Sequence, residues 1–260
     1  MAPDPPPAIP AATVILLRDR PDGAPPQILM VQRAPTMAFA PGAIVFPGGR
    51  VDEADRSLAC EIDHGLTEED AAARIAAIRE TIEEVGLFIG MPPPPAATGT
   101  AVRLAMRDGM AFATALRRWN LTLDLPALEP WSRWRPGAAE LPNVTRIFDT
   151  RFYIARAPDD TKSAAVDGIE TIRLRWASAA EFIADCDAAR EFAIFPTRCN
   201  LERLTQANSH AALIDFARRF DHPPIIPWID HRGDEPHLRI PDTLGYPITS
   251  RPTEEAQSPP

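Results

Sequence analysis

Hydrophobic and polar residues alternate in short runs over the first fifty positions of the chain. Residues 13–17 and 28–31 are rich in β-branched and aliphatic side chains, and Pro21-Asp22-Gly23 between them has a turn composition. The two runs therefore predict a β-hairpin. Residues 44–46 predict a third short strand, which ends at Pro47-Gly48-Gly49.

A helical spacing replaces this alternation between residues 67 and 85. Thr67 can cap the first turn, with Asp70 at the third helical position, and Gly86 stands where a left-handed C-terminal cap belongs. Four apolar residues fall on one stripe at about 100° per residue: Ile75, Ile78, Ile82 and Val85. This segment is the clearest predicted helix of the chain.

The second half of the chain mixes both kinds of element. The predictions there are a helix at 100–118, an irregular Trp- and Pro-rich segment at 131–142, strands at 151–155 and 169–176, a helix that begins with a capping box at Ser178, and a helical pair at 197–206 and 209–220. Together with the early strands, these elements predict an α/β fold in which helices cover a mixed sheet.

Prolines, 30 of 260 residues, mark the expected limits of the folded part. Residues 1–10 predict a disordered Pro-rich tail, and residues 241–260 predict a flexible tail. Residues 11–240 between them predict one domain. The proline run at 92–95 cannot be helical, and we interpret it as the start of a mainly helical insert at 91–142.

The overall charge and the cysteines limit the function classes. A formal net charge of −9 argues against non-specific nucleic-acid binding but allows an anionic substrate, because a bound divalent cation inverts the local field. Cys60, Cys186 and Cys199 lack the spacing of a zinc site, so they predict the reduced thiols of a cytoplasmic protein. No apolar run approaches the roughly 18 residues that cross a bilayer, so no membrane partner is expected.

Three carboxylates lie on the side of the 67–85 helix opposite its apolar stripe. Glu80, Glu83 and Glu84 are close enough on a helix to repel one another, by about 0.2–0.5 kcal/mol per pair. A hard divalent cation such as Mg²⁺ or Mn²⁺ would convert this repulsion into coordination. The alternative is a solvated acidic face on which Arg79 forms ordinary i,i+4 pairs.

Together with the glycines upstream, this stretch resembles the Nudix box, G-x5-E-x7-R-E-U-x-E-E-x-G-U, in which U is apolar. The matching positions are Gly49, Arg79, Glu80, Glu83, Glu84, Gly86 and Leu87. Asp55 stands in place of the first glutamate, and Thr81 replaces an apolar residue. The 23 residues at 56–78 stand where the pattern has seven, so the box carries an insertion. We expect residues 56–66 to form a surface excursion, which is tolerable because loop-closure cost rises slowly with length.

The residues before the box resemble the coenzyme A signature of the peroxisomal acyl-CoA diphosphatase branch of the Nudix superfamily, which also carries an insertion in its box. The positions that fit the signature are Arg33, Gly42, Ile44, Phe46, Pro47, Gly48 and Gly49. Ala34 replaces its serine, and Ala38 replaces its second arginine. Because a guanidinium is well suited to phosphate recognition, we expect this loss to weaken CoA binding.

The resemblance implies a Nudix-type α/β/α sandwich with a mixed sheet, plus inserted and C-terminal helices. It implies a divalent-metal-dependent hydrolase that cleaves CoA or acyl-CoA to 3′,5′-ADP and (acyl-)phosphopantetheine, with Mg²⁺ or Mn²⁺ as cofactor. The implied metal ligands are Gly49, Glu80, Glu83 and Glu84. The implied catalytic residues are Glu80, Glu83, Glu84, Arg79 and Glu170, and the implied substrate-binding residues are Arg33, Gly48, Gly49 and Arg50.

Several alternatives stay open at this point. The proton acceptor could be a box glutamate or Glu170, which could equally be an outward-facing strand residue. Trp131, Trp134 and Trp176 could stack on adenine or pack in the core. The substrate could be ADP-ribose, NADH or a dinucleotide, or the chain could be a non-catalytic nucleotide-binding module. We expect a small-molecule partner without nucleic acid or membrane, and a homodimer is compatible with the sequence.

Overall fold

Strand β1 (Ile9–Arg18) is buried on both of its faces in the computed structural model, which describes residues 7–135, 147–161, 164–233 and 235–254. Val14 and Leu16 contribute to one hydrophobic core, and Ile15 and Leu17 contribute to a second one. Successive strand residues point to opposite faces, so β1 separates two apolar layers. This double burial requires helices on both sides of the sheet.

The main sheet is mixed and runs in the order β3-β2-β1-β6-β5-β8, with β4 paired to β1 and β7 paired to β2. β1 pairs in parallel with β6 and antiparallel with β2 and β4. The bounds of the other strands are β2 (Gln27–Arg33), β3 (Ile44–Val45), β4 (Gly48–Arg50), β5 (Glu129–Trp134), β6 (Phe148–Arg156), β7 (Thr171–Ser178) and β8 (Pro224–Ile225).

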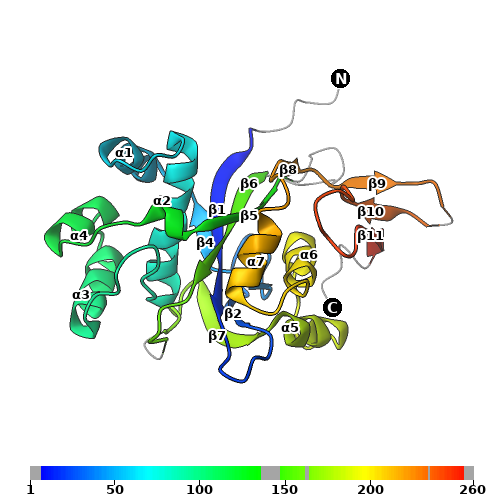
Figure 1. Cartoon of the computed structure of the whole chain (residues 1–260), viewed down its shortest axis with the longest axis horizontal. Coiled ribbons are helices and arrows are strands. Elements are labelled where there is room, and N and C mark those ends of the chain that lie inside the picture. Colours follow the sequence, from blue (N-terminus) through cyan, green and yellow to red (C-terminus); the bar gives the residue numbers. More distant parts are fainter. Residues whose placement is uncertain (1–6, 136–146, 162–163, 234, 255–260) are drawn as a thin grey trace.

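Helices cover the two faces of this sheet in two groups (Figure 1). One group is α1 (Glu53–Glu61), α2 (Glu68–Val85), α3 (Ala96–Arg107) and α4 (Phe112–Arg118), followed by the short 3₁₀ helix η1 (Leu125–Ala127). The other group is α5 (Ala179–Asp187), α6 (Phe195–Leu204) and α7 (His210–Ala217). The predicted α/β/α arrangement with a mixed sheet is confirmed.

Helix α2 begins and ends at the residues that the sequence predicts. The Thr67 side chain accepts a hydrogen bond from the Asp70 amide at 3.3 Å, and Gly86 adopts a left-handed conformation with φ of 72°. The four residues of the apolar stripe are fully buried: Ile75, Ile78, Ile82 and Val85. Both caps and the stripe therefore fix which face of α2 carries its carboxylates.

Residues 56–66 differ from the expected surface excursion. Helix α1 occupies most of this stretch, and Leu58 and Ala59 are buried in the same core as α2. Asp52 and Asp55 form a reciprocal capping box at the start of α1. The insertion in the box is therefore a packed helix followed by a short connection.

The predicted helix at 100–118 is two helices, because Gly109 adopts a positive φ of 95° between α3 and α4. The segment at 131–142, predicted to be irregular, contains part of β5, and its residues after 135 lie outside the described part. These elements are set by contacts with distant strands, which local composition does not reveal.

The two expected tails contribute to the fold where the structure describes them. β1 begins at Ile9, inside the predicted N-terminal tail, and residues 1–6 lie outside the described part. A three-stranded sheet is formed by β9 (Trp228–Asp230), β10 (His237–Arg239) and β11 (Ser250–Pro252). Tyr246, in the predicted flexible tail, is buried against Trp134, and residues 255–260 lie outside the described part.

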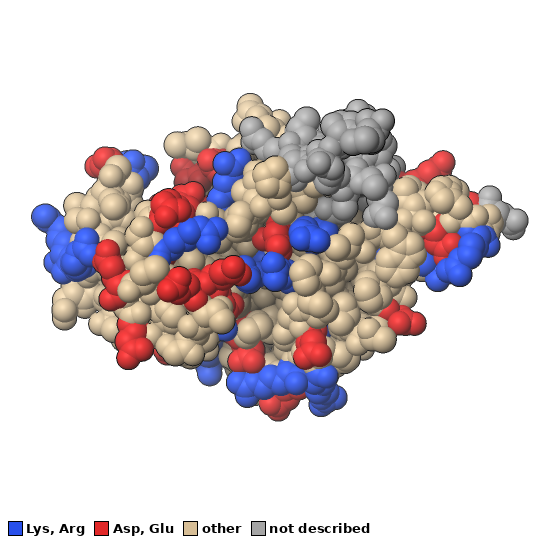
Figure 2. All heavy atoms as spheres, turned by 90° about the horizontal axis from the view of Figure 1, so that it is seen from above, with Lys and Arg blue, Asp and Glu red and all other residues tan. Residues whose placement is uncertain are grey.

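Charged side chains of both signs lie next to each other on the face seen in Figure 2. Many of them are paired in the described part of the chain, as in the bidentate contacts of Arg133 with Asp149 at 2.6 Å and of Arg218 with Glu129 at 2.9 Å. Within the same residues, no helix has the length and apolar character needed to cross a bilayer.

Candidate active site

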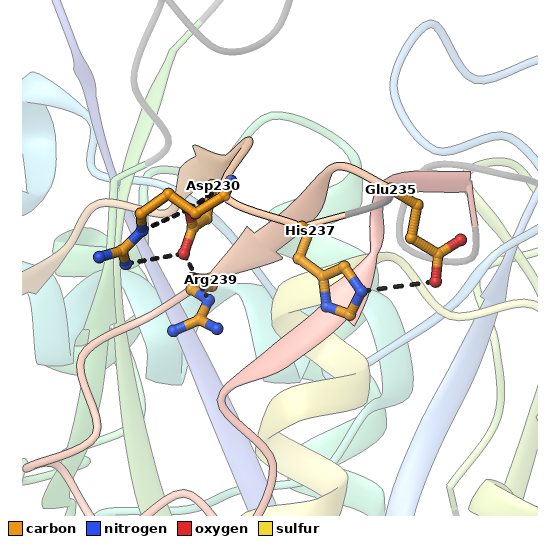
Figure 3. A pocket seen from close by; sticks show the side chains of 6 residues that line it. Asp230, Glu235, His237 and Arg239 are labelled. Atoms are coloured by element: carbon orange, nitrogen blue, oxygen red, sulfur yellow. Dashed lines mark hydrogen bonds and ion pairs between the residues drawn. The ribbon is translucent and has the colours of Figure 1, made fainter.

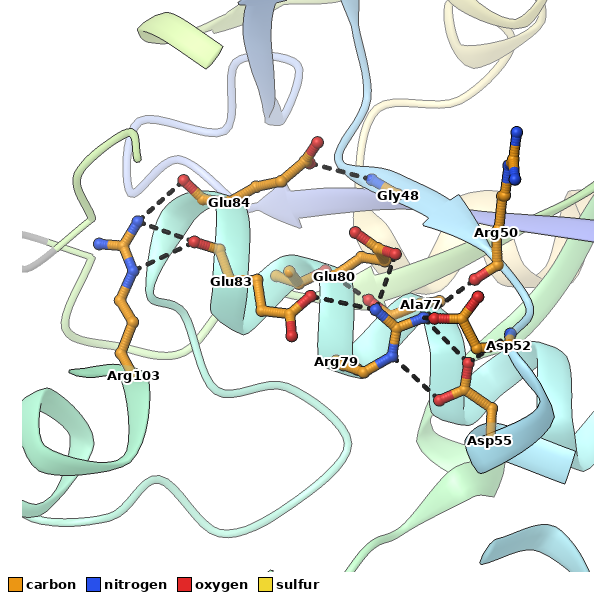
Figure 4. A network of polar contacts seen from close by, with 11 residues as sticks. Gly48, Arg50, Asp52, Asp55, Ala77, Arg79, Glu80, Glu83, Glu84 and Arg103 are labelled. Carbon is orange, nitrogen blue, oxygen red and sulfur yellow. Dashed lines mark hydrogen bonds and ion pairs between the residues drawn. The ribbon is translucent and has the colours of Figure 1, made fainter. Parts of the chain in front are cut away.

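Arg79 on α2 is the centre of a polar network that joins three separate segments (Figure 4). Its Nε and Nη2 atoms donate to the two carboxylate oxygens of Asp55 at 3.0 and 2.9 Å. Nη2 also donates to the main-chain carbonyl of Arg50 at 2.9 Å. Arg79 therefore fastens α1 and β4 to the helix that carries the carboxylates.

The same guanidinium contacts two of the box glutamates. Arg79 Nη1 donates to Glu80 Oε1 at 2.8 Å and to Glu83 Oε2 at 3.0 Å. Glu84 lies on the other side of this cluster and accepts a hydrogen bond from the Gly48 amide at 3.1 Å. Glu80 and Glu84 thus lie against β4, which brings the two halves of the interrupted box together.

Close approach of β4 to α2 explains the two glycines after Pro47. A Cβ atom on Gly49 would fall on the Glu80 carboxyl group, and a Cβ atom on Gly48 would overlap the main chain of β1 at Ala12 and Thr13. Only glycine leaves room for a carboxylate to lie directly against the strand.

Burial raises the pKa values of all three glutamates. Burial raises the pKa of Glu80 to about 7, against the opposing charge of Arg79. The pKa of Glu83 is raised by burial, and that of Glu84 is raised well above its usual range by burial and then by the charge of Glu80. Burial lowers the pKa of Arg79, but its contacts with Asp55 and the glutamates raise it further, so the guanidinium stays charged. Arg79 alone therefore does not offset the cost of ionising these buried carboxyl groups.

A cavity of about 730 Å³ opens beside these glutamates. Its apolar wall includes Leu87, Phe88, Pro93, Pro94, Leu104, Val166 and Ile169. Its charged lining residues are Glu80, Glu83, Glu84, Asp159, Asp160, Asp167, Glu170, Arg103 and Arg107. A cavity of this size, with an apolar wall and convergent polar groups, suits a small-molecule ligand.

The donors at this site fit a hard divalent ion in their chemistry. Glu80, Glu83 and Glu84 offer carboxylate oxygens, and Gly49 offers a main-chain carbonyl next to Glu80. Within the described ranges, no three His, Cys, Asp or Glu side chains are already arranged around a common point as ligands. Arg79 engages one oxygen each of Glu80 and Glu83, which leaves the second oxygen of each carboxylate for an ion.

The predicted substrate-binding residues lie around the glutamates but do not line the cavity. Arg33 donates from Nε to the carbonyl of Phe39 at 3.0 Å. The Arg50 side chain points away from Arg79 in Figure 4, and its guanidinium lies 6.0 Å from the ring of Phe148. Gly48 and Gly49 contact the glutamates instead. By contrast, Glu170 is exposed and lines the cavity together with the box glutamates.

Two of the three candidate tryptophans are core residues. Trp131 and Trp134 are at most 1% exposed, and their indole nitrogens donate to Asn200 and Tyr246. Trp176 is partly exposed, and the Arg18 guanidinium lies 4.4 Å from its ring. The core-packing alternative therefore holds for Trp131 and Trp134.

None of the motifs found in the sequence places α3 at this cavity. Arg103, Leu104 and Arg107 line it from a helix that begins after the proline run. The two arginines are four residues apart and therefore share a helix face, which is the one local signal that could have identified them.

A second hollow of about 740 Å³ lies on the C-terminal sheet (Figure 3). Arg232 forms a bidentate contact with Asp230, and the Arg239 Nε atom lies 3.1 Å from the same carboxylate. His237 lies 3.5 Å from Glu235. These charged groups neutralise one another, so the cavity beside α2 is the candidate active site.

Comparisons with known proteins agree with the described fold. A family model described as the NUDT19 Nudix domain matches residues 59–204. Acyl-coenzyme A diphosphatase NUDT19 of Homo sapiens is 30% identical over 207 residues, which are 60% of this chain and 54% of that protein. The Gallus gallus protein of the same name is 26% identical over 208 residues, with 60% and 55% covered. The chain thus spans about half the length of these relatives.

The fold is also found in a solved structure. The crystal structure of a NUDIX hydrolase from Alicyclobacillus acidocaldarius superposes with a TM-score of 0.66. The two chains are 24% identical, and the match covers 80% of this chain and 96% of that one.

Proposed function

Because the chain belongs to the NUDT19 Nudix domain family, we propose that it is a divalent-metal-dependent hydrolase that cleaves CoA or acyl-CoA. Water would break the P–O–P linkage and yield 3′,5′-ADP and (acyl-)phosphopantetheine. The curated relatives named acyl-coenzyme A diphosphatase support this substrate class.

One observation carries the choice of substrate: the box glutamates and an apolar wall line the same cavity. Leu104 is 44% exposed and Ile169 is 71% exposed on that wall, although both are large aliphatic residues. Exposed apolar surface inside a ligand cavity favours a ligand with an apolar arm. Acyl-CoA has such an arm beyond its diphosphate, whereas ADP-ribose and dinucleotides carry polar groups there.

The proposed ligands of the metal are Glu80, Glu83, Glu84 and the Gly49 carbonyl. A bound Mg²⁺ or Mn²⁺ supplies charge neutralisation for the diphosphate and lowers the pKa of a water molecule. It would also favour the ionised form of the three glutamates, whose pKa values are raised by burial.

The chain's own groups do the positioning in this proposal. Arg79 holds Glu80 and Glu83 in one orientation while Asp55 holds Arg79. The buried stripe of α2 keeps these carboxylates on a rigid helix, which suits a reaction that depends on positioning and charge stabilisation. Glu170, exposed on the cavity lining, is the proposed acceptor of the water's proton.

A substrate panel tests the proposal. Purified protein is incubated with CoA, an acyl-CoA, ADP-ribose, NADH and a diadenosine polyphosphate, each with Mg²⁺ or Mn²⁺, and the products are resolved by chromatography. The expected result is 3′,5′-ADP from CoA and acyl-CoA, lost on addition of EDTA and in Glu84→Gln protein prepared in parallel. Cleavage of ADP-ribose or NADH alone would refute the substrate, and no turnover of any compound would indicate a non-catalytic module.

A further inference from the structure

Helix α3 presents two arginines to the cavity that holds the box glutamates. Arg103 and Arg107 both line this cavity, and residues four apart on a helix lie about 5–6 Å from each other. Leu104, on the same wall, supplies apolar surface beside them. The pair therefore lies on a face of α3 that lines the same cavity as the carboxylates.

Main-chain contacts hold Arg103 in place. Its Nε and Nη2 atoms donate to the Glu83 carbonyl at 3.2 and 3.0 Å, and Nη2 also donates to the Glu84 carbonyl at 3.0 Å (Figure 4). Its third nitrogen, Nη1, has no acceptor among the described residues. One donor of a fixed guanidinium thus stays available at the C-terminal end of α2.

Arg107 is exposed, and within the described ranges no carboxylate pairs with it. Burial lowers the pKa of Arg103, Asp167 opposes this effect, and the like charge of Arg107 adds to it. Arg103 and Arg107 therefore repel each other, and Asp167 offsets part of this repulsion at Arg103. An anion bound across both would remove this repulsion.

Acidic side chains outnumber basic ones among the described residues that line the cavity. Seven acidic residues line the cavity, against these two arginines: Glu80, Glu83, Glu84, Asp159, Asp160, Asp167 and Glu170. Among the described lining residues, Arg103 and Arg107 are the cations that a phosphate away from the metal site could contact. A position between them offsets the repulsion from the acidic side chains.

We propose that Arg103 and Arg107 form a subsite for a phosphomonoester of the substrate that is separate from the cleaved diphosphate. This inference rests on the proposed function, in which the 3′-phosphate of CoA is that group. The ribose carries it close to the diphosphate, in keeping with two arginines that line the same cavity as the box glutamates. The subsite would also explain how the chain binds CoA with Ala38 in place of the signature arginine.

Binding of a product tests the subsite without turnover. The dissociation constants of 3′,5′-ADP and 5′-AMP are measured by titration calorimetry in the presence of Mg²⁺ for wild-type, Arg107→Gln and Arg118→Gln proteins. Arg118 is a matched control, because it is an exposed arginine on the neighbouring helix α4 and does not line the cavity. Wild type and Arg118→Gln should bind 3′,5′-ADP about tenfold more tightly than 5′-AMP, and Arg107→Gln should lose that preference.

The results separate this subsite from the proposed function. Equal affinity of wild type for the two nucleotides, or an unchanged preference in Arg107→Gln, would overturn the subsite even if CoA is hydrolysed. A preference that depends on Arg107 would support the subsite even if the substrate panel shows no CoA cleavage, and only the proposed reaction would then fail.

Discussion

The guanidinium of Arg79 forms a bidentate ion pair with the carboxylate of Asp55, 24 residues earlier in the chain, through two hydrogen bonds of 3.0 and 2.9 Å. Asp55 is 2% exposed and also accepts a hydrogen bond from the Asp52 amide at the start of α1. The shorter arm of aspartate reaches Arg79 because α1 begins directly beside it. This ion pair closes the box across its insertion.

We expect Asp55→Asn to lower the free energy of unfolding by at least about 2 kcal/mol, because it leaves the buried end of Arg79 with an uncompensated donor. Asp52→Asn is the matched control, since Asp52 is 61% exposed and lies 3.5 Å from the same guanidinium. Asp52→Asn should lower the free energy of unfolding by less than about 1 kcal/mol. Urea titrations of both variants measure this difference, and equal values would contradict a structural role for Asp55.

Glu84→Gln should lower kcat by about 100-fold or more, the scale of losing one principal electrostatic contributor. The fold should persist, because the amide oxygen can still accept the hydrogen bond from Gly48. Addition of Mn²⁺ should raise the Tm of wild type and leave the Tm of the variant unchanged. Glu69→Gln, at an exposed position in the first turn of α2, is the control and should keep full activity. If Glu84→Gln kept more than a tenth of wild-type activity, Glu84 would not be a principal metal ligand.

The insertion in the box should contribute to stability rather than be dispensable. From the sequence alone, shortening residues 56–66 would be expected to leave the fold intact, but Leu58 is 5% exposed in the core that α1 shares with α2. Leu58→Ala should therefore lower the free energy of unfolding by about 2–5 kcal/mol. Ser57→Ala, at an exposed position, should lower it by less than about 0.5 kcal/mol. Denaturant unfolding of the two variants checks this, and a neutral Leu58→Ala would mean that α1 is peripheral.

Ala38→Arg should lower the KM of CoA by about tenfold, the contribution of one charge-assisted contact to phosphate. Ala38 is exposed in the loop that Arg33 holds through the Phe39 carbonyl. If Arg103 and Arg107 bind the 3′-phosphate, the new arginine at position 38 contacts the diphosphate instead. Dephospho-CoA keeps the diphosphate and lacks the 3′-phosphate, so its KM should fall by the same factor. A decrease for CoA alone would instead assign the 3′-phosphate to position 38.

The sequence predicts the parts of the site that depend on local spacing. Glu80, Glu83 and Glu84 share a face because a helix repeats every 3.6 residues, and Thr67 and Gly86 are caps that act within their own turn. The contribution of α3 could not be predicted, because Arg103 binds main-chain carbonyls 19 and 20 residues away. The packing of α1 and the pairing of β5 with β6 likewise depend on contacts between distant segments.

The attachment of α3 to α2 uses backbone oxygens, which every amino acid provides. Arg103 would therefore dock in the same way whatever side chains occupied positions 83 and 84. Conversely, substitutions at residues 104 and 107 leave the hydrogen bonds of Arg103 to the α2 carbonyls in place. If Arg107 binds substrate as proposed, substitutions on α3 would alter substrate selection and leave the acidic helix unchanged.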